Sequence, residues 1–276
     1  MRQSLMKGTM LLLMLMVTVC AFARQKSLLH CDVPKGVSSQ VLVREGYVTS
    51  YNKDTRLPNW VAWRLTKEHM ESPVPGIDRK MFDFHRDDEV ENPVEKYDYH
   101  YKQTGYQRGH MCPYADCKWS MKAADETFLM TNICPQTEML NKKTPAWRRL
   151  EDACRAWAKD GLGDIYIVAG PIVSRDCETI GSGIVVPKAF YKVVLRFDGR
   201  SLQGFGVMYR NVDGGRIQSS IHSIDGIERL TKLDFFSALP DELENKVESA
   251  YDIDEWPGLR EIIESNITPN NYDYGK

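Results

Sequence analysis

The stretch that decides the fold runs from residue 106 to residue 151 and reads YQRGHMCPYADCKWSMKAADETFLMTNICPQTEMLNKKTPAWRRLE. It opens with an extended segment that carries Arg108 and His110. We expect a second strand over Glu126–Ile133 (ETFLMTNI), because apolar and β-branched residues follow one another there. A helix is predicted over Met139–Lys159, where large apolar residues recur at mostly three- and four-residue intervals. Two strands that fold back onto this helix would bring His110 close to its start.

The side chains on this unit suit the hydrolysis of a phosphate ester. A neutral histidine such as His110 can activate water near neutral pH. Positive charge must meet the negative charge that gathers on the phosphate oxygens, and Arg108 is adjacent. A hard divalent cation would add to it, and such ions prefer oxygen ligands such as the Asn141 amide, with several waters retained. Glu151, about three turns into the helix, could hold a metal-bound water.

Each of these four residues also has a purely structural interpretation. A lone histidine is more often structural than catalytic, so His110 could simply be hydrogen-bonded in a turn. Asn141 could be a helix cap. Glu151 could be solvated on the helix surface, and Arg108 could form a surface ion pair of small energetic value.

The rest of the chain predicts an α+β domain with a central, largely antiparallel sheet flanked by helices. Helices are expected where Ser223 can cap Ile224–Thr231, and in two short segments near the C-terminus, Asp241–Ser249 and Pro257–Glu264. Residues 71–95 are rich in proline and charge, which predicts a long surface excursion. The strands are expected at Val41–Tyr47, Asn59–Leu65, Asp164–Ala169, Ala189–Phe197 and Leu202–Tyr209.

The first 23 residues are typical of a cleaved export signal. Arg2 and Lys7 precede an apolar run, and Ala21-Phe22-Ala23 offers small residues for cleavage. The run is too short for a bilayer, which needs about 20 apolar residues, so no stable membrane span is expected. A lipoprotein cysteine at Cys20 is the alternative, although the bulky Val19 before it fits that processing poorly. We therefore expect export to a periplasm or to the medium.

The net charge and the cysteine content indicate which partners and which redox state to expect. Without Arg2 and Lys7 the chain has 34 basic and 38 acidic residues, a net charge of −4. Because a protein that coats nucleic acid is usually basic, contact with a polyanion would have to be local. The even cysteine count after residue 23 favours disulfides in an exported protein. A zinc knuckle of His110, Cys112, Cys117 and Cys134 is the alternative, but the spacing is unusual for one.

Several segments in order resemble the DNA/RNA non-specific endonucleases, the ββα-metal nucleases. Residues 107–110 (QRGH) resemble the DRGH signature of that family, and residues 128–136 (FLMTNICPQ) resemble its YLSNISPQ segment. Leu140-Asn141 and residues 146–151 (AWRRLE) resemble its LN…AWxxLE segment. The likeness extends over roughly residues 38–250. It implies an Mg²⁺-dependent endonuclease, with Mn²⁺ as the alternative ion, that cuts DNA and RNA.

The resemblance also implies a role for each site residue. His110 would be the general base, Asn141 the metal ligand, and Glu151 a support for the water shell of the metal. Arg108 and Asn132 would shape the site. The family also uses an upstream arginine on the scissile phosphate, for which Arg79 is the first candidate and Arg86 the second.

Two departures from the family pattern bear on activity. Gln107 replaces the aspartate of the signature, so altered pH or metal dependence is expected. The segment between Asn141 and Trp147 is two residues longer than usual, and Pro145 is expected to start the regular helix. Two other functions therefore remain open: a nucleic-acid-binding protein with weakened catalysis on the same fold, and a phosphodiesterase for another ester. The sequence leaves the oligomeric state undetermined.

The predicted organisation has four parts. A signal peptide covers residues 1–23, an N-terminal segment residues 24–37, the nuclease domain residues 38–267 and a flexible tail residues 268–276.

Overall fold

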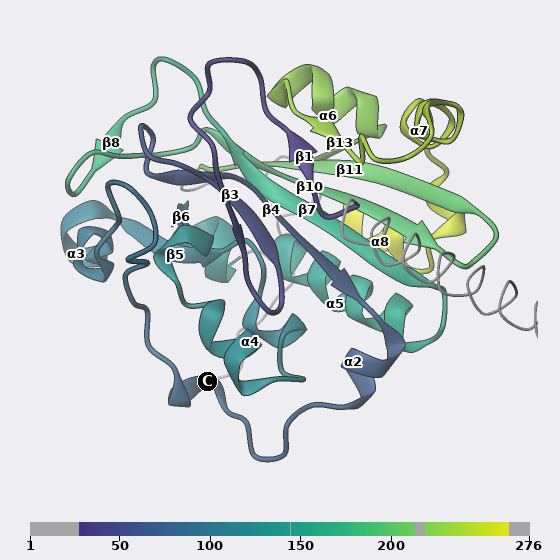
Figure 1. The fold of residues 1–276 in the computed structure, drawn as a ribbon, viewed down its shortest axis with the longest axis horizontal. Coiled ribbons are helices and arrows are strands. Elements are labelled where there is room, and N and C mark those ends of the chain that lie inside the picture. The colour runs from purple at the N-terminus through teal and green to yellow at the C-terminus, as the bar shows by residue number, and fades with distance from the viewer. Residues whose placement is uncertain (1–27, 144, 213–218, 265–276) are drawn as a thin grey trace, which may run out of the picture.

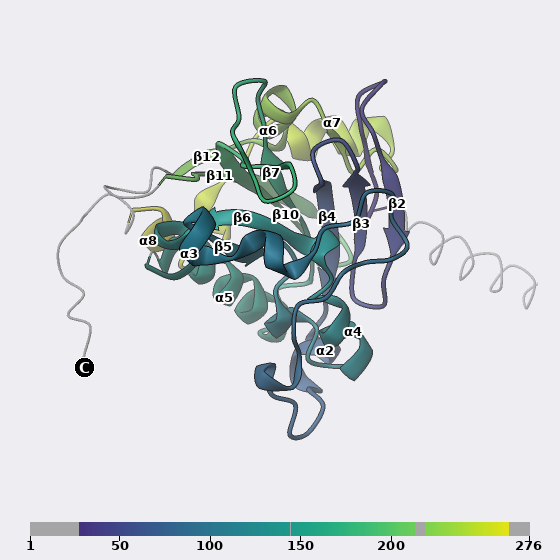
Figure 2. The ribbon, with the colours of Figure 1, turned by 90° about the vertical axis from the view of Figure 1, so that its left-hand side faces the viewer.

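A computed structural model describes residues 28–143, 145–212 and 219–264. The predicted signal peptide and tail lie outside these residues. The predicted α+β class is confirmed, because one large antiparallel sheet lies between two layers that contain the helices (Figures 1 and 2). None of the described helices is long and apolar enough to cross a membrane.

The central sheet has seven strands, and each neighbouring pair is antiparallel. The predicted strand Ala189–Phe197 is observed with the same bounds and lies in the middle of the sheet. In spatial order the strands are β12 (Ser219–His222), β11 (Leu202–Arg210), β10 (Ala189–Phe197), β7 (Asp164–Ile172), β4 (Leu57–Leu65), β3 (Val48–Asn52) and β2 (Gln40–Val43).

Three two-stranded sheets complete the β structure. They pair β1 (Cys31–Asp32) with β13 (Asp234–Phe235), β5 (Tyr106–His110) with β6 (Ile133–Thr137), and β8 (Thr179–Ile180) with β9 (Ile184–Val185).

The two faces of the central sheet pack against different layers because successive side chains of a strand point to opposite sides. On β10, Phe190 and Val194 belong to the core beneath α5 (Pro145–Lys159), and we call this side the α5 face. Tyr191 and Val193 belong to the core beneath α6 (Ile224–Thr231), which we call the α6 face.

The remaining helices divide between the two faces. The α6 face also carries α7 (Asp241–Glu248) (Figure 1). The other side carries α2 (Lys67–Glu71), α3 (Tyr101–Thr104), α4 (Met121–Glu126) and α8 (Leu259–Glu264). Single helical turns occur at η1 (Arg79–Met81), η2 (Lys96–Tyr99), η3 (Tyr114–Asp116), η4 (Met130–Asn132), η5 (Met139–Lys143) and η6 (Ile253–Glu255).

Local signals account for several of these elements. The hydroxyl of Ser223 accepts a hydrogen bond from the Gly226 amide, as predicted for the cap of α6. The helix predicted over Met139–Lys159 is present but divided, with a π-helical turn, η5, before the regular helix that starts at Pro145 as expected.

Two predicted strands differ from the observed ones by more than three residues at one end. Residues 126–133 are not a strand: α4 ends at Glu126 and η4 follows, so the strand begins only at Ile133. The Asn132 side chain bonds to the backbone of Thr127 and of Cys112, and the periodicity of the sequence gives no sign of these contacts. The segment predicted as Val41–Tyr47 ends as a strand at Val43, because the Arg44 amide donates to the Tyr47 carbonyl and closes a hairpin.

Candidate active site

The hairpin of β5 and β6 positions Arg108 and His110. Both side chains project from the same side of β5 because they are two residues apart. Gly109 lies between them and points the other way, against β6. A Cβ atom at Gly109 would lie 2.1 Å from Oε1 of Gln136, so the close packing of this strand pair requires glycine.

The imidazole of His110 lies in an aromatic corner. Its ring centroid is 5.2 Å from that of Phe84 and 5.1 Å from that of Phe128. The residue is partly exposed, but its Nε2 is buried and has no hydrogen-bond partner among the described residues. Burial, with a smaller contribution from Arg79, lowers the pKa of His110 to about 3. The unliganded imidazole is therefore neutral at physiological pH.

Two arginines pack against the same aromatic pair. The Arg79 guanidinium carbon lies 4.6 Å from the ring centroid of Phe128 and 5.5 Å from that of Phe84. The Arg108 guanidinium carbon lies 4.6 Å from the Phe84 centroid. Three of the predicted residues, Arg79, Arg108 and His110, are thus brought together around two phenylalanines (Phe84 and Phe128) that sequence reasoning did not select.

Arg86, the alternative to Arg79, has other partners. Its guanidinium pairs with Asp88 at 2.7 Å and with Glu95 at 2.9 Å on the surface. Arg79 lies on η1 and is exposed. The surface excursion therefore turns back onto β5 at Arg79 and Phe84, which the sequence pattern did not indicate.

Asn132 acts on the backbone around the site. It is fully buried, and its Oδ1 accepts from the Cys112 amide at 2.9 Å. Its Nδ2 donates to the carbonyls of Cys112 and Thr127, each at 2.8 Å. These bonds fix the turn that follows His110, so Asn132 supports the site from behind.

Glu151 forms a buried ion pair that the sequence did not predict. Its Oε1 lies 3.0 Å from Nζ of Lys192, and the two side chains are 12% and 1% exposed. Lys192 Nζ also lies 3.9 Å from the Trp147 ring centroid. Burial raises the pKa of Glu151, while the positive charge of Lys192 lowers it. A lysine within the apolar run AFYKVVL was the available signal, because a buried lysine needs a partner.

A second buried carboxylate lies beside this pair. Asp116 is fully buried, and its Oδ2 accepts from the Trp63 indole at 2.8 Å. Its Oδ1 accepts from Arg155 at 2.5 Å. The α5 face thus contains two anion–cation pairs in which each carboxylate has a cation within hydrogen-bond distance.

Asn141 carries the amide oxygen predicted to be a cation ligand. It lies on η5, directly after β6, and is partly exposed. The amide of the preceding Leu140 donates to Thr137 Oγ1, which ties this turn to the end of β6. An accessible amide oxygen fits Mg²⁺ or Mn²⁺, which take oxygen ligands and retain water. The Glu151 carboxylate is already paired with Lys192, so its direct use as a ligand would compete with that pair.

The expected disulfides are not formed. The described cysteines, including Cys112, Cys117 and Cys134, are all free thiols. Sγ of Cys112 and Sγ of Cys117 are 3.7 Å apart, well beyond the S–S bond length of about 2.05 Å. Burial raises the pKa of the thiols of Cys112, Cys134 and Cys154, which disfavours the reactive thiolate. The zinc knuckle is not assembled either: among the described residues His110 and these cysteines do not form a metal-ligand cluster.

Comparison with known proteins gives a consistent result. The sequence model of the DNA/RNA non-specific endonucleases matches residues 25–242. A nuclease of Nostoc sp. is 32% identical over 224 residues, which are 77% of this chain and 78% of that protein. Human mitochondrial endonuclease G is 32% identical over 168 residues, 57% of this chain and 54% of that protein.

A solved structure gives the same fold. The crystal structure of an EndoG/EndoGI complex contains a chain that superposes with a TM-score of 0.63 at 27% identity. The match covers 74% of this chain and 89% of that chain. Together with the ordered motifs around His110, these matches show that the chain belongs to the DNA/RNA non-specific endonuclease family.

Proposed function

We propose that this protein is a metal-dependent endonuclease that hydrolyses phosphodiester bonds in DNA and RNA without sequence specificity. The observation that carries the proposal is the gathering of Arg79, Arg108 and His110 around Phe84 and Phe128. Family membership supports the same reaction.

His110 would be the general base. Its Nε2 is unpartnered among the described residues, and the imidazole is neutral, so a lone pair is available to accept a proton from water. A bound phosphate would offset the charge of Arg79, one of the causes that lower the pKa of His110. The base would therefore be stronger in the substrate complex than in the free protein.

The two arginines would hold the scissile phosphate. Their guanidinium groups are fixed on ring faces, so little side-chain freedom is lost when they donate to phosphate oxygens. Because every nucleotide has the same phosphate, these contacts provide no base specificity. The sugar is likewise not selected by them, which suits activity on both DNA and RNA.

A hard divalent cation, Mg²⁺ or Mn²⁺, would be held by Asn141 and, when bound, would supply positive charge for the leaving oxygen. Glu151 would orient water near Asn141 while Lys192 keeps its carboxylate ionised. Asn132 would keep the turn after His110 in place. Gln107, opposite Gln136 in the β5–β6 register, provides no charge, which favours an altered metal or pH dependence.

Export remains part of the proposal. It is supported by the basic, apolar and small-residue order of residues 1–23. Relatives named as mitochondrial, from human and from Saccharomyces cerevisiae, indicate that family members also occur in another compartment.

The test is digestion of circular plasmid and of RNA, analysed on gels, with Mg²⁺ and with excess chelator. We expect the wild type to cut both substrates with Mg²⁺ and neither with chelator. His110→Ala should lose about 10²–10⁴-fold in rate, the usual contribution of a general base. His30→Ala, which removes an exposed histidine elsewhere, is the matched control and should retain full activity.

The arginine assignment is tested in the same assay. Arg79→Ala should cost about 10²–10³-fold, and Arg86→Ala should cost little. A wild-type protein that binds nucleic acid but cuts nothing with Mg²⁺ or Mn²⁺ between pH 6 and 9 would instead establish the binding function.

A further inference from the structure

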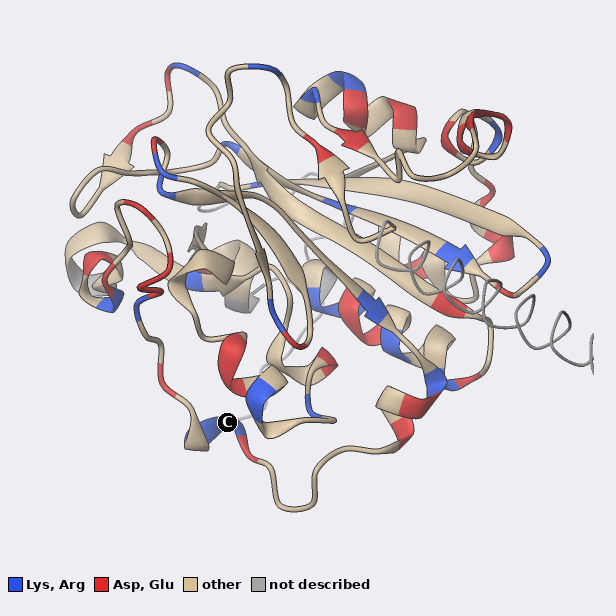
Figure 3. Cartoon of the chain, in the orientation of Figure 1, with Lys and Arg blue, Asp and Glu red and all other residues tan. Residues whose placement is uncertain are grey.

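Acidic side chains of α6 and α7 converge on the α6 face, opposite the candidate active site. Figure 3 shows acidic segments on both helices on this side of the sheet. Asp225 lies in the first turn of α6, Glu228 lies one turn later, and Glu248 is the last residue of α7. Two elements from different parts of the chain thus contribute carboxylates to one place.

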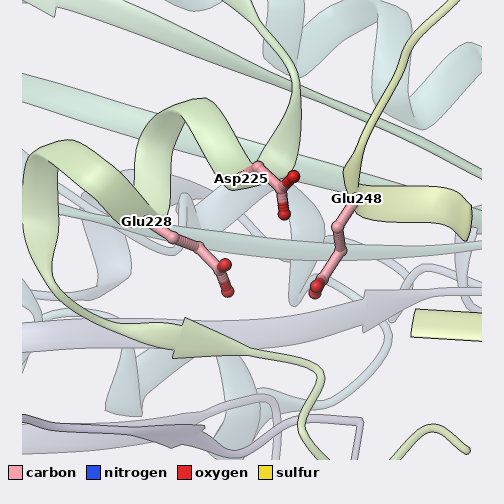
Figure 4. Close-up of side chains that lie close together, drawn as sticks. All are labelled: Asp225, Glu228 and Glu248. Carbon is pink, nitrogen blue, oxygen red and sulfur yellow. The ribbon is translucent and has the colours of Figure 1, made fainter. Parts of the chain in front are cut away.

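The three carboxylates share one small space. One oxygen from each lies within 4.8 Å of the others. Figure 4 shows the side chains of Asp225 and Glu228 approaching from α6 and that of Glu248 from the end of α7. Their carboxylate oxygens face the space between the two elements.

Glu248 gives an independent reason to expect a ligand. The residue is only 5% exposed, and its Oε1 has no hydrogen-bond partner among the described residues. Its carboxylate points toward those of Asp225 and Glu228 (Figure 4). An unpartnered buried carboxylate is costly unless it is protonated or bound to a cation. Glu244 also has a buried, unpartnered Oε1, which adds another acceptor beside the cluster.

No basic residue in the described parts of the chain forms an ion pair with Asp225, Glu228 or Glu248. The hydrogen bond recorded for Glu228 is from the Phe235 amide, at 2.8 Å, and it satisfies one oxygen only. Burial, together with the neighbouring carboxylates, raises the pKa of Glu248 to about 9. Without a cation, Glu248 is therefore protonated near neutral pH, and a bound cation would replace that proton.

We propose that Asp225, Glu228 and Glu248 bind a divalent cation of the calcium class, which joins α6 to the end of α7. All three donors are carboxylates, which suits a hard cation. Oxygens that lie within 4.8 Å of one another can share one such ion, and the longer, more flexible coordination of Ca²⁺ accepts three carboxylates more readily than the strict octahedron of Mg²⁺. The site lies across the sheet from His110, so the ion stabilises the fold and takes no part in the cutting of nucleic acid.

The experiment measures the thermal midpoint, Tm, of the chelator-treated full chain as Ca²⁺ is added. An Asn141→Ala background removes the amide proposed to hold the catalytic ion, so that its loading does not contribute. Ca²⁺ at ten times its Kd should raise Tm by about 3–6 °C, the shift expected for one site in a domain of this size. Calorimetry of the same protein should give one Ca²⁺ per chain.

Two variants make the test specific. Glu248→Gln should abolish the calcium-dependent rise in Tm, whereas Glu242→Gln, an exposed position on α7, should retain it. If Glu248→Gln fails to fold, Asp225→Asn, at a partly exposed member of the cluster, serves the same purpose.

Three results would overturn the proposal: no rise in Tm in the parent protein, an equal rise in the Glu248→Gln or Asp225→Asn variant, or equal affinity for Mg²⁺. Nuclease activity is not needed for any of these measurements, so the outcome is independent of the proposed function.

Discussion

The two faces of the central sheet differ in whether a buried carboxylate has a cationic partner. On the α5 face, Glu151 lies 3.0 Å from a lysine that is itself buried. On the α6 face, Glu248 is also buried but has carboxylates for neighbours. Glu151 therefore has its partner within the protein, whereas Glu248 keeps an acceptor oxygen without a partner among the described residues.

The difference distinguishes the structural ion pair on the α5 face from the proposed cation site on the α6 face. A buried pair such as Lys192–Glu151 contributes little net stability to the fold, but removal of one partner leaves the other buried without a compensating charge. A buried carboxylate without a cation has the opposite property, because its replacement removes the free-energy cost of protonating or charging it in the folded protein. The effect of neutralising each carboxylate therefore distinguishes the two faces experimentally.

The largest effect is expected for Lys192→Met. This change leaves Glu151 buried without its cation and should lower the free energy of unfolding by about 3–5 kcal/mol. Urea denaturation checks it. The double variant Lys192→Met, Glu151→Gln should recover part of the loss, because neither charge then remains. A single variant as stable as the wild type would mean that water or another group already neutralises Glu151.

A smaller effect of opposite sign is expected for Glu248→Gln. In chelator near neutral pH, this variant should be as stable as the wild type or more stable by up to about 2 kcal/mol, because Glu248 has to take up a proton on folding and glutamine does not. Glu151→Gln should be strongly destabilising under the same conditions. If both variants lose stability equally, the contrast between the two faces does not hold.

The smallest effect concerns His110, whose charge is suppressed by burial on the α5 face. Its pKa in the folded protein is about 3, below the ordinary value near 6.5, so protons favour the unfolded state as the pH falls. The wild type should lose about 1.4 kcal/mol between pH 7.5 and 5.5 relative to His110→Gln. Urea denaturation of both proteins measures this difference. An imidazole NMR titration with a midpoint near 6.5 in the folded protein would contradict it.

Much of the fold could be predicted because its signals are local. The run Ala189–Phe197 gave a strand with the correct bounds, and Ser223 gave the start of α6. The segment at 126–133 was misassigned because its turn depends on Asn132 bonding to Cys112, twenty residues earlier in the chain. Disulfides were expected from cysteine number alone, yet the thiols are placed by core packing.

The candidate site divides in the same way. His110 and Arg108 could be selected because they lie within one short motif, and the order of the motifs indicated the family. The choice of Arg79 as an aromatic-stacked partner depends on the return of a long surface excursion to Phe84 and Phe128. The periodicity of the sequence does not predict this packing, because the contacts join residues that are far apart in the chain.

By itself, the sequence determined the α+β class, the central strands and the segment that carries His110 and Asn141. Those features depend on the spacing of residues along one chain segment. Only the tertiary structure decided that Lys192 neutralises Glu151 and that Glu248 meets Asp225 and Glu228. Coulomb energy and desolvation depend on which distant segments pack together and on how much water remains between them. The pairing and protonation of a buried carboxylate are therefore determined only when the sheet and its two helical layers assemble.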